Sequence, residues 1–418
     1  MIMNLKLHKS QIQQKSQIAV TGSKSETNRL LLLQALFSNI ALENTSNSDD
    51  SEVMMKALVQ NPEPKTLNPE TIDIHHAGTA MRFLTAYFAI QENREVTITG
   101  SPRMKERPIM ILVEALKQLG AEISYEENEG FPPIKIVGKR LTESKVSLPA
   151  DVSSQYISAL LLIAPKLENG LELTLEGKIT SIPYIKMTLA LLDEIGVKTA
   201  FDGNKILVKP KADRQEPKVL MVESDWSSAS YFYSIVALSK TGTEIKLSSY
   251  KQNSLQGDSA LAEIYKDFGV ETKFENNEIF LCKLENCQLS TVNYQLNDAP
   301  DIAQTIAVTC FGLGISCHLT GLHTLKIKET DRLEALRIEL EKLGAKISVT
   351  NDSLTLEASS KINQNIAIAT YNDHRMAMAF APLALKTDIM INDAEVVSKS
   401  FPDFWNDLKQ IGFEIENS

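Results

Sequence analysis

A recurring phrase is the feature of this chain that most restricts its fold. In each copy, apolar residues at helical spacing lead to a glycine, and a short alternating stretch follows. The glycine suits the left-handed position after a helix, so each copy predicts a helix, a glycine cap and a strand. The five glycines are Gly120, Gly196, Gly269, Gly344 and Gly412.

The spacing of these glycines predicts the size of the repeated unit. They lie 76, 73, 75 and 68 positions apart. Units of about seventy residues exceed the roughly 20 to 50 residues of solenoid repeats, and they favour compact α/β units packed into larger domains. Met54–Leu58 is expected to end the matching helix of a first unit without the glycine. Six units would then fill the chain, three on each side of Lys240–Thr243.

Composition places the chain among soluble globular proteins. Its 418 residues are 43% hydrophobic and 23% charged, with a formal net charge of −10. Nucleic acid is not expected as a partner, because binding to its phosphates depends on clustered, uncompensated Lys and Arg. The four cysteines show no C-x-x-C spacing, which predicts neither a zinc site nor a disulfide framework. No apolar run reaches about 18 residues, so we expect neither secretion nor a membrane span.

Local clusters of cations inside this acidic chain predict binding of a small anion. Thr21–Arg29 places Lys24, Arg29 and two serines directly before an apolar run. A helix start of this kind offers backbone N–H groups, the positive end of the helix dipole and full charges to an oxyanion. Further segments with cations among expected helix-start residues are 103–108, 328–332, 372–375 and 397–400.

Each motif also has a plain structural interpretation. Thr21–Arg29 could be a helix cap with a solvated lysine, and it lacks the spacing of a P-loop. Arg103–Pro108 could be a surface turn, and His374 a satisfied helix-start histidine. Glu329 and Arg332 could form an ordinary helical ion pair. The joint occurrence of these segments at matching places in the repeat favours a ligand site.

These segments resemble the signatures of the 5-enolpyruvylshikimate 3-phosphate synthase family, from about Val20 to Pro402. The matching segments, in order, are Gly22–Ser25, Ala77–Arg82, Pro102–Ile109, Ser153–Gln155, Lys328–Arg332 and Tyr371–Met378. The resemblance implies an enolpyruvyl transferase fold: an inverse α/β barrel of two domains, each with three βαβαββ-type units, and an active site in the interdomain cleft. We expect residues 1–20 and 240–418 to form one discontinuous domain, and residues 21–239 to form the inserted domain.

The resemblance also implies which residues bind substrates and which are catalytic. For shikimate 3-phosphate they are Lys24, Ser25, Arg29, Ser153, Ser154, Gln155, Ser181, Tyr184, Asp301, Thr324 and Lys328. For phosphoenolpyruvate they are Lys24, Gly78, Thr79, Arg107, Gln155, Arg332, His374, Arg375 and Lys399. Asp301 is implied as the general base for the substrate 5-hydroxyl, while Glu329 and Lys24 would handle the proton at the phosphoenolpyruvate methylene.

The implied reaction is addition followed by elimination, with no metal and no organic cofactor. C3 of phosphoenolpyruvate is protonated, the 5-hydroxyl attacks C2, and a tetrahedral intermediate expels inorganic phosphate. Anionic carboxylates can stabilise the cationic centre at C2, while cations hold the negative groups of the substrates. The resemblance implies a monomer in the cytoplasm that acts on small molecules in the shikimate pathway, towards chorismate and aromatic amino acids.

Three residues depart from the family pattern. His76 and Phe83 stand where the motif usually has asparagine and proline, from which we hypothesise altered sensitivity to the family inhibitor glyphosate. Thr324 stands where an asparagine often contacts the shikimate phosphate, which predicts a weaker or water-mediated contact.

Three alternatives stay open at this point. A UDP-N-acetylglucosamine enolpyruvyl transferase typically has a Lys-Asn pair where this chain has Lys24 and Ser25. A non-catalytic phosphate-ester binding protein would have no need of both Asp301 and Glu329. A phosphate-handling kinase is disfavoured by the missing Walker motif.

Overall fold

The chain divides into two compact units. The computed structural model describes residues 3–59, 70–150, 153–177, 179, 182–211, 216–285 and 287–418. Unit 1 comprises Met1–Gly22 and Glu223–Ser418, and unit 2 comprises Ser23–Val222. The sequence placed the second boundary at residues 239 and 240. Helix α8 (Trp226–Leu238) instead belongs to unit 1, because it packs against α10 (Ala303–Leu313).

Five four-stranded sheets in the described part of the chain share one pattern of pairing. Along each sheet the first pair of neighbouring strands is parallel, and the next two pairs are antiparallel. The two sheets of unit 2 have the order β4 (Glu70–Asp73), β5 (Glu95–Thr99), β7 (Ile134–Val137), β6 (Glu122–Tyr125) and the order β8 (Lys145–Pro149), β9 (Leu171–Glu176), β11 (Lys205–Val208), β10 (Thr199–Asp202). This shared pairing confirms the repeated α/β unit.

The three sheets of unit 1 follow the same pattern. Their strands, in order within each sheet, are β2 (Lys15–Ile18), β13 (Glu244–Ser248), β15 (Glu278–Lys283), β14 (Val270–Glu275); β16 (Val292–Gln295), β17 (Cys317–Thr320), β19 (Ser353–Leu356), β18 (Ile347–Val349); and β20 (Ile366–Ile368), β21 (Ile389–Ile391), β1 (Leu5–Leu7), β22 (Ile415–Asn417). The N-terminal strands β1 and β2 thus complete sheets whose other strands lie far along the chain.

The chain passes between the units twice. In unit 2, β3 (Ile40–Glu43) pairs in parallel with β12 (Lys218–Met221). Strand β2 of unit 1 leads into α1 (Lys24–Leu36) of unit 2, whereas β12 of unit 2 leads into α8 of unit 1. Each unit therefore depends on a helix whose preceding strand belongs to the other unit.

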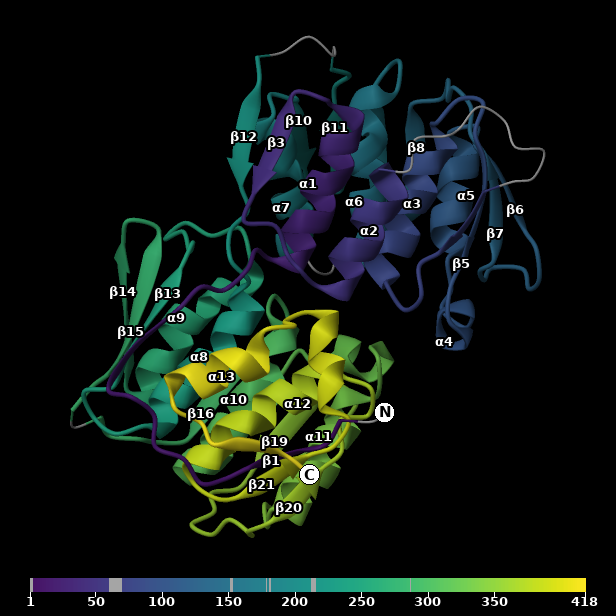
Figure 1. Ribbon diagram of the computed structural model, residues 1–418. Coiled ribbons are helices and arrows are strands. Elements are labelled where there is room, and N and C mark those ends of the chain that lie inside the picture. The colour runs from purple at the N-terminus through teal and green to yellow at the C-terminus, as the bar shows by residue number, and fades with distance from the viewer. Residues whose placement is uncertain are drawn as a thin grey trace. The chain divides into compact units, whose positions relative to one another are not determined.

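The helices with the longest apolar runs form the interior of each unit (Figure 1). In unit 2, α1, α3 (Gly78–Ala89) and α6 (Ser154–Ile163) pack on one another. In unit 1, α10 packs against both α8 and α12 (His374–Phe380). Nearly all residues of α3, α6, α8 and α10 are buried, which fits their all-round apolar sequences. Helices lie inside and sheets outside, so the inverse α/β arrangement is confirmed.

The remaining helices are shorter or more exposed. They are α2 (Asp49–Val59), α4 (Pro102–Lys105), α5 (Met110–Gln118), α7 (Ile182–Glu194), α9 (Leu261–Ile264), α11 (Arg332–Lys342) and α13 (Phe404–Ile411). The 3₁₀ helices are η1 (Ala164–Lys166), η2 (Gly257–Ala260), η3 (Tyr265–Phe268), η4 (Pro300–Ile302), η5 (His323–Ile327), η6 (Ala381–Leu385) and η7 (Ala394–Lys399).

The five repeated glycines occupy the predicted position. Each follows a helix, precedes a strand and has a positive φ, from 72° at Gly269 to 115° at Gly412. A side chain is disfavoured in this conformation, which explains why glycine recurs at the same place in the repeat. The prediction of a helix, a glycine and a strand is confirmed.

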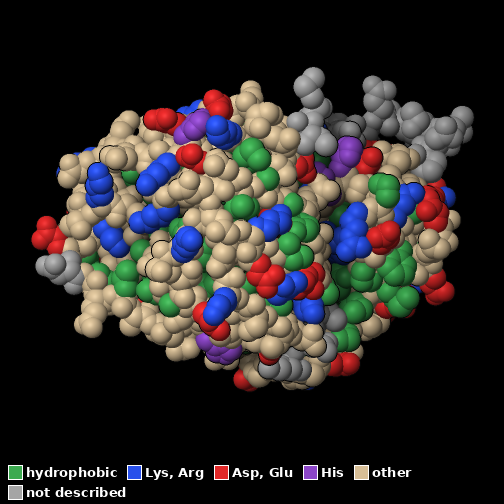
Figure 2. Space-filling model, turned by 90° about the horizontal axis from the view of Figure 1, so that it is seen from below, with side chains coloured by type: hydrophobic (Ala, Val, Ile, Leu, Met, Phe, Trp, Pro, Cys, Tyr) green, Lys and Arg blue, Asp and Glu red, His purple; other side chains and the backbone are tan. Residues whose placement is uncertain are grey.

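Charge is mixed over the surface. On the face drawn in Figure 2, acidic and basic side chains are interspersed, in keeping with the net charge of −10. None of the described helices is long and apolar enough to span a bilayer. Within the same residues, no three His, Cys, Asp or Glu side chains are grouped so that they could hold a metal ion.

Candidate active site

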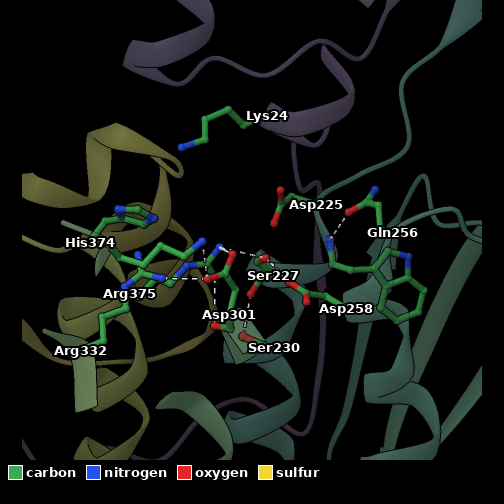
Figure 3. A network of polar contacts seen from close by, with 12 residues as sticks. Lys24, Asp225, Ser227, Ser230, Gln256, Asp258, Asp301, Arg332, His374 and Arg375 are labelled. Carbon is green, nitrogen blue, oxygen red and sulfur yellow. Dashed lines mark hydrogen bonds and ion pairs between the residues drawn. The ribbon is translucent and has the colours of Figure 1, made fainter. Parts of the chain in front are cut away.

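In unit 1, the predicted site residues meet around the carboxylate of Asp301 (Figure 3). Asp301 lies in η4, directly before the buried helix α10, and is only 8% exposed. Its Oδ1 accepts a hydrogen bond from Arg332 Nη1 at 2.8 Å and lies 3.5 Å from Lys328 Nζ. Its Oδ2 lies 3.4 Å from Arg375 Nη2. Three cations therefore contact one buried carboxylate.

These cations control the protonation of Asp301. Burial by itself would raise the pKa of this carboxyl, but Lys328, Arg375 and Arg332 together hold that pKa well below its usual range. Asp301 is therefore ionised at neutral pH, and its affinity for a proton depends on how strongly the three cations remain directed at it.

Arg332, the first residue of α11, binds three carboxylates. Its Nε donates to Asp373 Oδ2 at 2.5 Å, and its Nη2 donates to Glu329 Oε2 at 2.7 Å. Burial alone would lower the pKa of Arg332, but Asp373, Glu329 and Asp301 raise it. Asp373 also caps α12, because its Oδ1 accepts from the backbone N–H of Arg375 at 2.9 Å. Asp373 thus joins the starts of α11 and α12. It lies within the motif Tyr371–Met378, but the sequence did not predict this role.

A second network reaches Arg375 from the start of α8. Arg375 Nη2 donates to Ser227 Oγ at 3.2 Å, and the Ser227 hydroxyl donates to Asp258 Oδ2 (Figure 3). Asp258 is buried in η2, and burial followed by the charge of Asp301 raises its pKa to about 6. Sequence reasoning missed both Ser227 and Asp258. The serine-rich start of α8 was a signal for Ser227, whereas only the fold brings Asp258 to it.

The three other predicted residues of unit 1 lie in three different helices. His374 opens α12 and is buried, with Nδ1 4.0 Å from Asp373 Oδ1. Lys399 Nζ donates to the carbonyl of Asn372 at 2.7 Å. The expected helix start at 397–400 is wrong, because Lys399 is the last residue of η7. Thr324 Oγ1 is buried without a hydrogen-bond partner among the described residues, and a ligand that bound it would satisfy it.

In unit 2, Lys24 is the first residue of α1. Its Nζ lies 3.4 Å from Oδ2 of Asp50, a buried residue near the start of α2. The carbonyl of Ser25 accepts from Arg29 Nη1 at 2.7 Å. Asp50 was not predicted from the sequence, because its pairing with Lys24 depends on the packing of two helices.

Arg29 is buried among hydroxyl groups and aromatic rings. Its Nε donates to Thr188 Oγ1 at 2.8 Å, and its Nη2 donates to Ser158 Oγ at 3.0 Å. Its Cζ lies 5.4 Å from the ring centroid of Phe83 and 5.8 Å from that of Tyr184. Burial lowers the pKa of Arg29 to about 10. Phe83, the departure from the family motif, therefore packs against a predicted site residue; altered glyphosate sensitivity stays a prediction.

The starts of α3 and α6 are joined by side chains. Thr79 Oγ1 accepts from Gln155 Nε2 at 3.1 Å, and the hydroxyl of Ser153 caps α6 by accepting from the backbone N–H of Gln155 at 3.3 Å. Gly78 opens α3 against Arg107: a Cβ built at Gly78 would lie 2.5 Å from Arg107 Nη1. Glycine therefore leaves room for the guanidinium, which a larger residue would displace.

The two units thus each gather part of the predicted set. Unit 1 brings Asp301, Lys328, Glu329, Arg332 and Arg375 into contact, and unit 2 brings Gly78 to Arg107 and Thr79 to Gln155. Ser154 is buried as the first residue of α6. Ser181 lies outside the described residues.

The fold and these sites define a class: a six-repeat α/β protein that presents cations and carboxylates at the starts of buried helices. A sequence model of the family described as EPSP synthase (3-phosphoshikimate 1-carboxyvinyltransferase) matches residues 9–408. The 3-phosphoshikimate 1-carboxyvinyltransferase of Bacteroides fragilis (strain YCH46) is 47% identical over 407 residues, 96% of each chain. The protein of that name from Shewanella halifaxensis is 36% identical over 416 residues, 94% of this chain and 96% of that one. The chain belongs to the EPSP synthase family.

A solved structure supports the fold. The 2.37 Å structure of EPSP synthase from Acinetobacter baumannii matches all of both chains with a TM-score of 0.82 and 22% identity. The chain therefore has the inverse α/β fold. It transfers the enolpyruvyl group of phosphoenolpyruvate to shikimate 3-phosphate in the shikimate pathway.

Proposed function

We propose that Asp301 is the general base of this transfer and that the cations on it bind the anionic groups of phosphoenolpyruvate. The observation that carries the proposal is one buried carboxylate contacted by Lys328, Arg332 and Arg375. A guanidinium suits both the carboxylate and the phosphate of this substrate, because its planar N–H groups can bind two oxygens at once. Arg375 Nε is buried without a hydrogen-bond partner among the described residues, so this donor is available to a ligand.

This arrangement makes the base depend on the substrate. In the free protein the cations hold the pKa of Asp301 well below its usual range, and a carboxylate with so low a pKa is a weak base. An anion that binds Arg332 and Arg375 adds negative charge beside Asp301 and raises its pKa. Asp301 would then accept the proton of the 5-hydroxyl only after phosphoenolpyruvate has bound.

Glu329 is proposed to act on the methylene proton. Its carboxylate binds Arg332 Nη2, and its side chain is 35% exposed, in contrast to buried Asp301. The partial exposure allows proton exchange with solvent, which a group that delivers a proton to C3 requires. Asp301 and Glu329, both held by Arg332, would stabilise the positive charge that develops at C2.

Residues of both units are proposed to supply the remaining substrate contacts. Arg107, which lies over Gly78, would bind phosphoenolpyruvate together with His374, Lys399, Thr79 and Gln155. Lys24, Ser25, Arg29, Tyr184, Ser153, Ser154, Ser181, Gln155, Thr324 and Lys328 would hold shikimate 3-phosphate. Several helix starts and cations are needed because a phosphate dianion requires several charge-assisted donors.

We also propose that the enzyme works as a monomer in the cytoplasm on small-molecule substrates. Support for the monomer is that each described unit has its own extensive core of buried apolar residues. Light scattering on the purified protein tests the oligomeric state: a mass near 46.4 kDa supports a monomer, and twice that mass contradicts it.

The experiment that tests the function measures phosphate release from phosphoenolpyruvate with shikimate 3-phosphate, omitting each substrate in turn. Release that requires both, with an enolpyruvyl product of matching mass, is the expected result. Release with UDP-N-acetylglucosamine instead, or binding of shikimate 3-phosphate without release, would contradict the proposed chemistry. A pre-steady-state comparison of proton uptake with and without phosphoenolpyruvate then tests whether Asp301 gains basicity on binding.

A further inference from the structure

The segment before α12 has an unusual backbone. Tyr371 and Asn372 have φ values of 53° and 58°, and Asp373, His374 and Arg375 follow directly. Asparagine tolerates this left-handed region, but a residue as bulky as tyrosine rarely adopts it. Two consecutive residues of this kind persist only where the surrounding structure holds them, and such outliers concentrate at functional sites.

The side chain that holds the segment is Glu339 on α11. Glu339 is completely buried, and its Oε1 accepts from the hydroxyl of Tyr371 at 2.7 Å. Its Oε2 accepts from the backbone N–H of Ala369 at 3.2 Å. Lys342 Nζ neutralises the carboxylate at 2.6 Å. Burial and Glu339 raise the pKa of Tyr371, so its hydroxyl remains a donor across the physiological range.

The same face of α11 holds the other end of the segment. Arg332 lies seven residues before Glu339, which is two helical turns or about 10 Å along the axis. Arg332 binds Asp373, and Glu339 binds Ala369 and Tyr371. Lys399 donates to the carbonyl of Asn372, between these two attachments. The strained turn is therefore fixed from both ends by one helix.

We propose that Glu339 and the hydroxyl of Tyr371 are positioning residues for phosphoenolpyruvate binding, because they fix the turn that sets the direction of His374, Arg375 and the Lys399 contact. Neither group lies in the cluster around Asp301, and neither is expected to touch substrate. The inference rests on the proposed binding roles of Arg375 and Lys399. A loss of the hydroxyl would let the left-handed turn relax, and Arg375 would move relative to Asp301.

The test compares two tyrosine hydroxyls of unit 1. Tyr371→Phe removes the hydrogen bond to Glu339. The matched control, Tyr294→Phe on β16, removes a hydroxyl that donates to Asp267 Oδ2 at 2.5 Å. We expect Tyr371→Phe to raise KM for phosphoenolpyruvate roughly tenfold with little change in kcat, since small displacements of a binding group weaken substrate positioning. Both variants should lower Tm by similar amounts, but Tyr294→Phe should leave KM for phosphoenolpyruvate unchanged.

A conservative variant and an independent variant complete the design. Glu339→Gln keeps an acceptor for Tyr371, so its KM should lie between those of the wild type and Glu339→Ala. An unchanged KM in Tyr371→Phe, with Tm lowered as in Tyr294→Phe, would overturn the proposal. Arg375→Lys separates the two claims: if it also leaves KM unchanged, the proposed substrate role of Arg375 fails. If it raises KM while Tyr371→Phe does not, only the positioning role fails.

Discussion

Buried arginines in the two units are balanced in opposite ways. In unit 1, carboxylates contact Arg332 and Arg375 and raise the pKa of each in spite of burial. In unit 2, burial lowers the pKa of Arg29 and of Arg82 to about 10. Arg82 donates to the carbonyls of Gly78 and Pro108, and Arg29 donates to hydroxyls.

The difference assigns different chemistry to the two regions. A carboxylate neutralises a cation and can also take up a proton, whereas a hydroxyl or carbonyl only orients the cation. Unit 1 is therefore suited to proton transfer, with its charge already balanced before substrate binds. Unit 2 keeps positive charge that a phosphate dianion can neutralise on binding. Four predictions, from the largest expected effect to the smallest, test this comparison.

Asp301→Asn should remove the negative charge that neutralises the three cations at the centre of the unit 1 cluster. We expect turnover to fall by roughly 10²–10⁴, the usual contribution of a positioned general base. Phosphoenolpyruvate affinity should be retained or increased, because the cations lose a competing carboxylate. Phosphate release measures the first effect and calorimetric titration the second. Wild-type turnover in the variant would remove Asp301 from the mechanism.

Lys24→Ala should remove a cation of unit 2 that is proposed to bind substrate. Because Lys24 is proposed to contact both substrates, we expect the dissociation constant of each to rise by roughly one to two orders of magnitude, with turnover lowered as well. Lys205→Ala is the matched control, since Lys205 forms an exposed ion pair with Glu172 on β9. If Lys24→Ala bound both substrates normally, the cation at the start of α1 would have no role in binding.

Gly78→Ala should displace the guanidinium of Arg107 without removing any charge. The added Cβ would overlap Nη1, so Arg107 must move. We expect KM for phosphoenolpyruvate to rise about tenfold while kcat changes less. Gly177→Ala is a control for backbone strain, because Gly177 has a φ of 82° and open space at its Cβ. Equal KM values for both variants would show that the position of Arg107 is unimportant.

Asp258→Asn in unit 1 and Thr188→Val in unit 2 should change the free energy of unfolding with different dependences on pH. The pKa of Asp258 is raised to about 6, so its contribution to the free energy of unfolding decreases as pH rises from about 4 to 6. Asp258→Asn should therefore stabilise the protein by about 3 kcal/mol at pH 7 and hardly at all at pH 4.

Thr188→Val removes the acceptor of Arg29 Nε and should cost about 1–3 kcal/mol at both pH values, because the hydrogen bond joins a guanidinium and a hydroxyl, neither of which titrates between them. Denaturant unfolding at the two pH values measures both variants. A gain from Asp258→Asn that is the same at pH 4 and pH 7 would contradict the raised pKa.

Much of the fold could be predicted from the sequence because neighbouring residues determine the repeated pattern. A helix, a glycine with positive φ and a strand need only neighbouring residues, and Gly120, Gly344 and the other copies carry them. The exchange of strands could not be predicted in this way. Nothing local in β1 or β2 indicates that they complete sheets with β22 and β13.

The candidate site also combines residues that local sequence predicts with residues that only tertiary packing brings to the site. Residues at helix starts, such as Lys24, Arg332 and Arg375, could be identified because a capped apolar helix has a local pattern. Asp50, which pairs with Lys24, and Asp258, which reaches Arg375 through Ser227, could not, because only tertiary packing brings these segments together. The family resemblance included Tyr371 in a matching segment but implied no role for it, and it gave no indication of Glu339.

The exchange of strands also has a consequence for synthesis of the chain. Strands β1 and β2 leave the ribosome before unit 2, yet their partners β13, β21 and β22 follow the whole of unit 2. Translation of residues 23–222 takes roughly 10–40 s at 5–20 residues per second. During that interval the N-terminal strands have no sheet to join, and unit 2 lacks only β12 until its end. Unit 2 is thus complete before the sheets of unit 1 that contain β1 and β2 can form. Unit 1 therefore finishes folding last, although its first two strands are synthesised before unit 2.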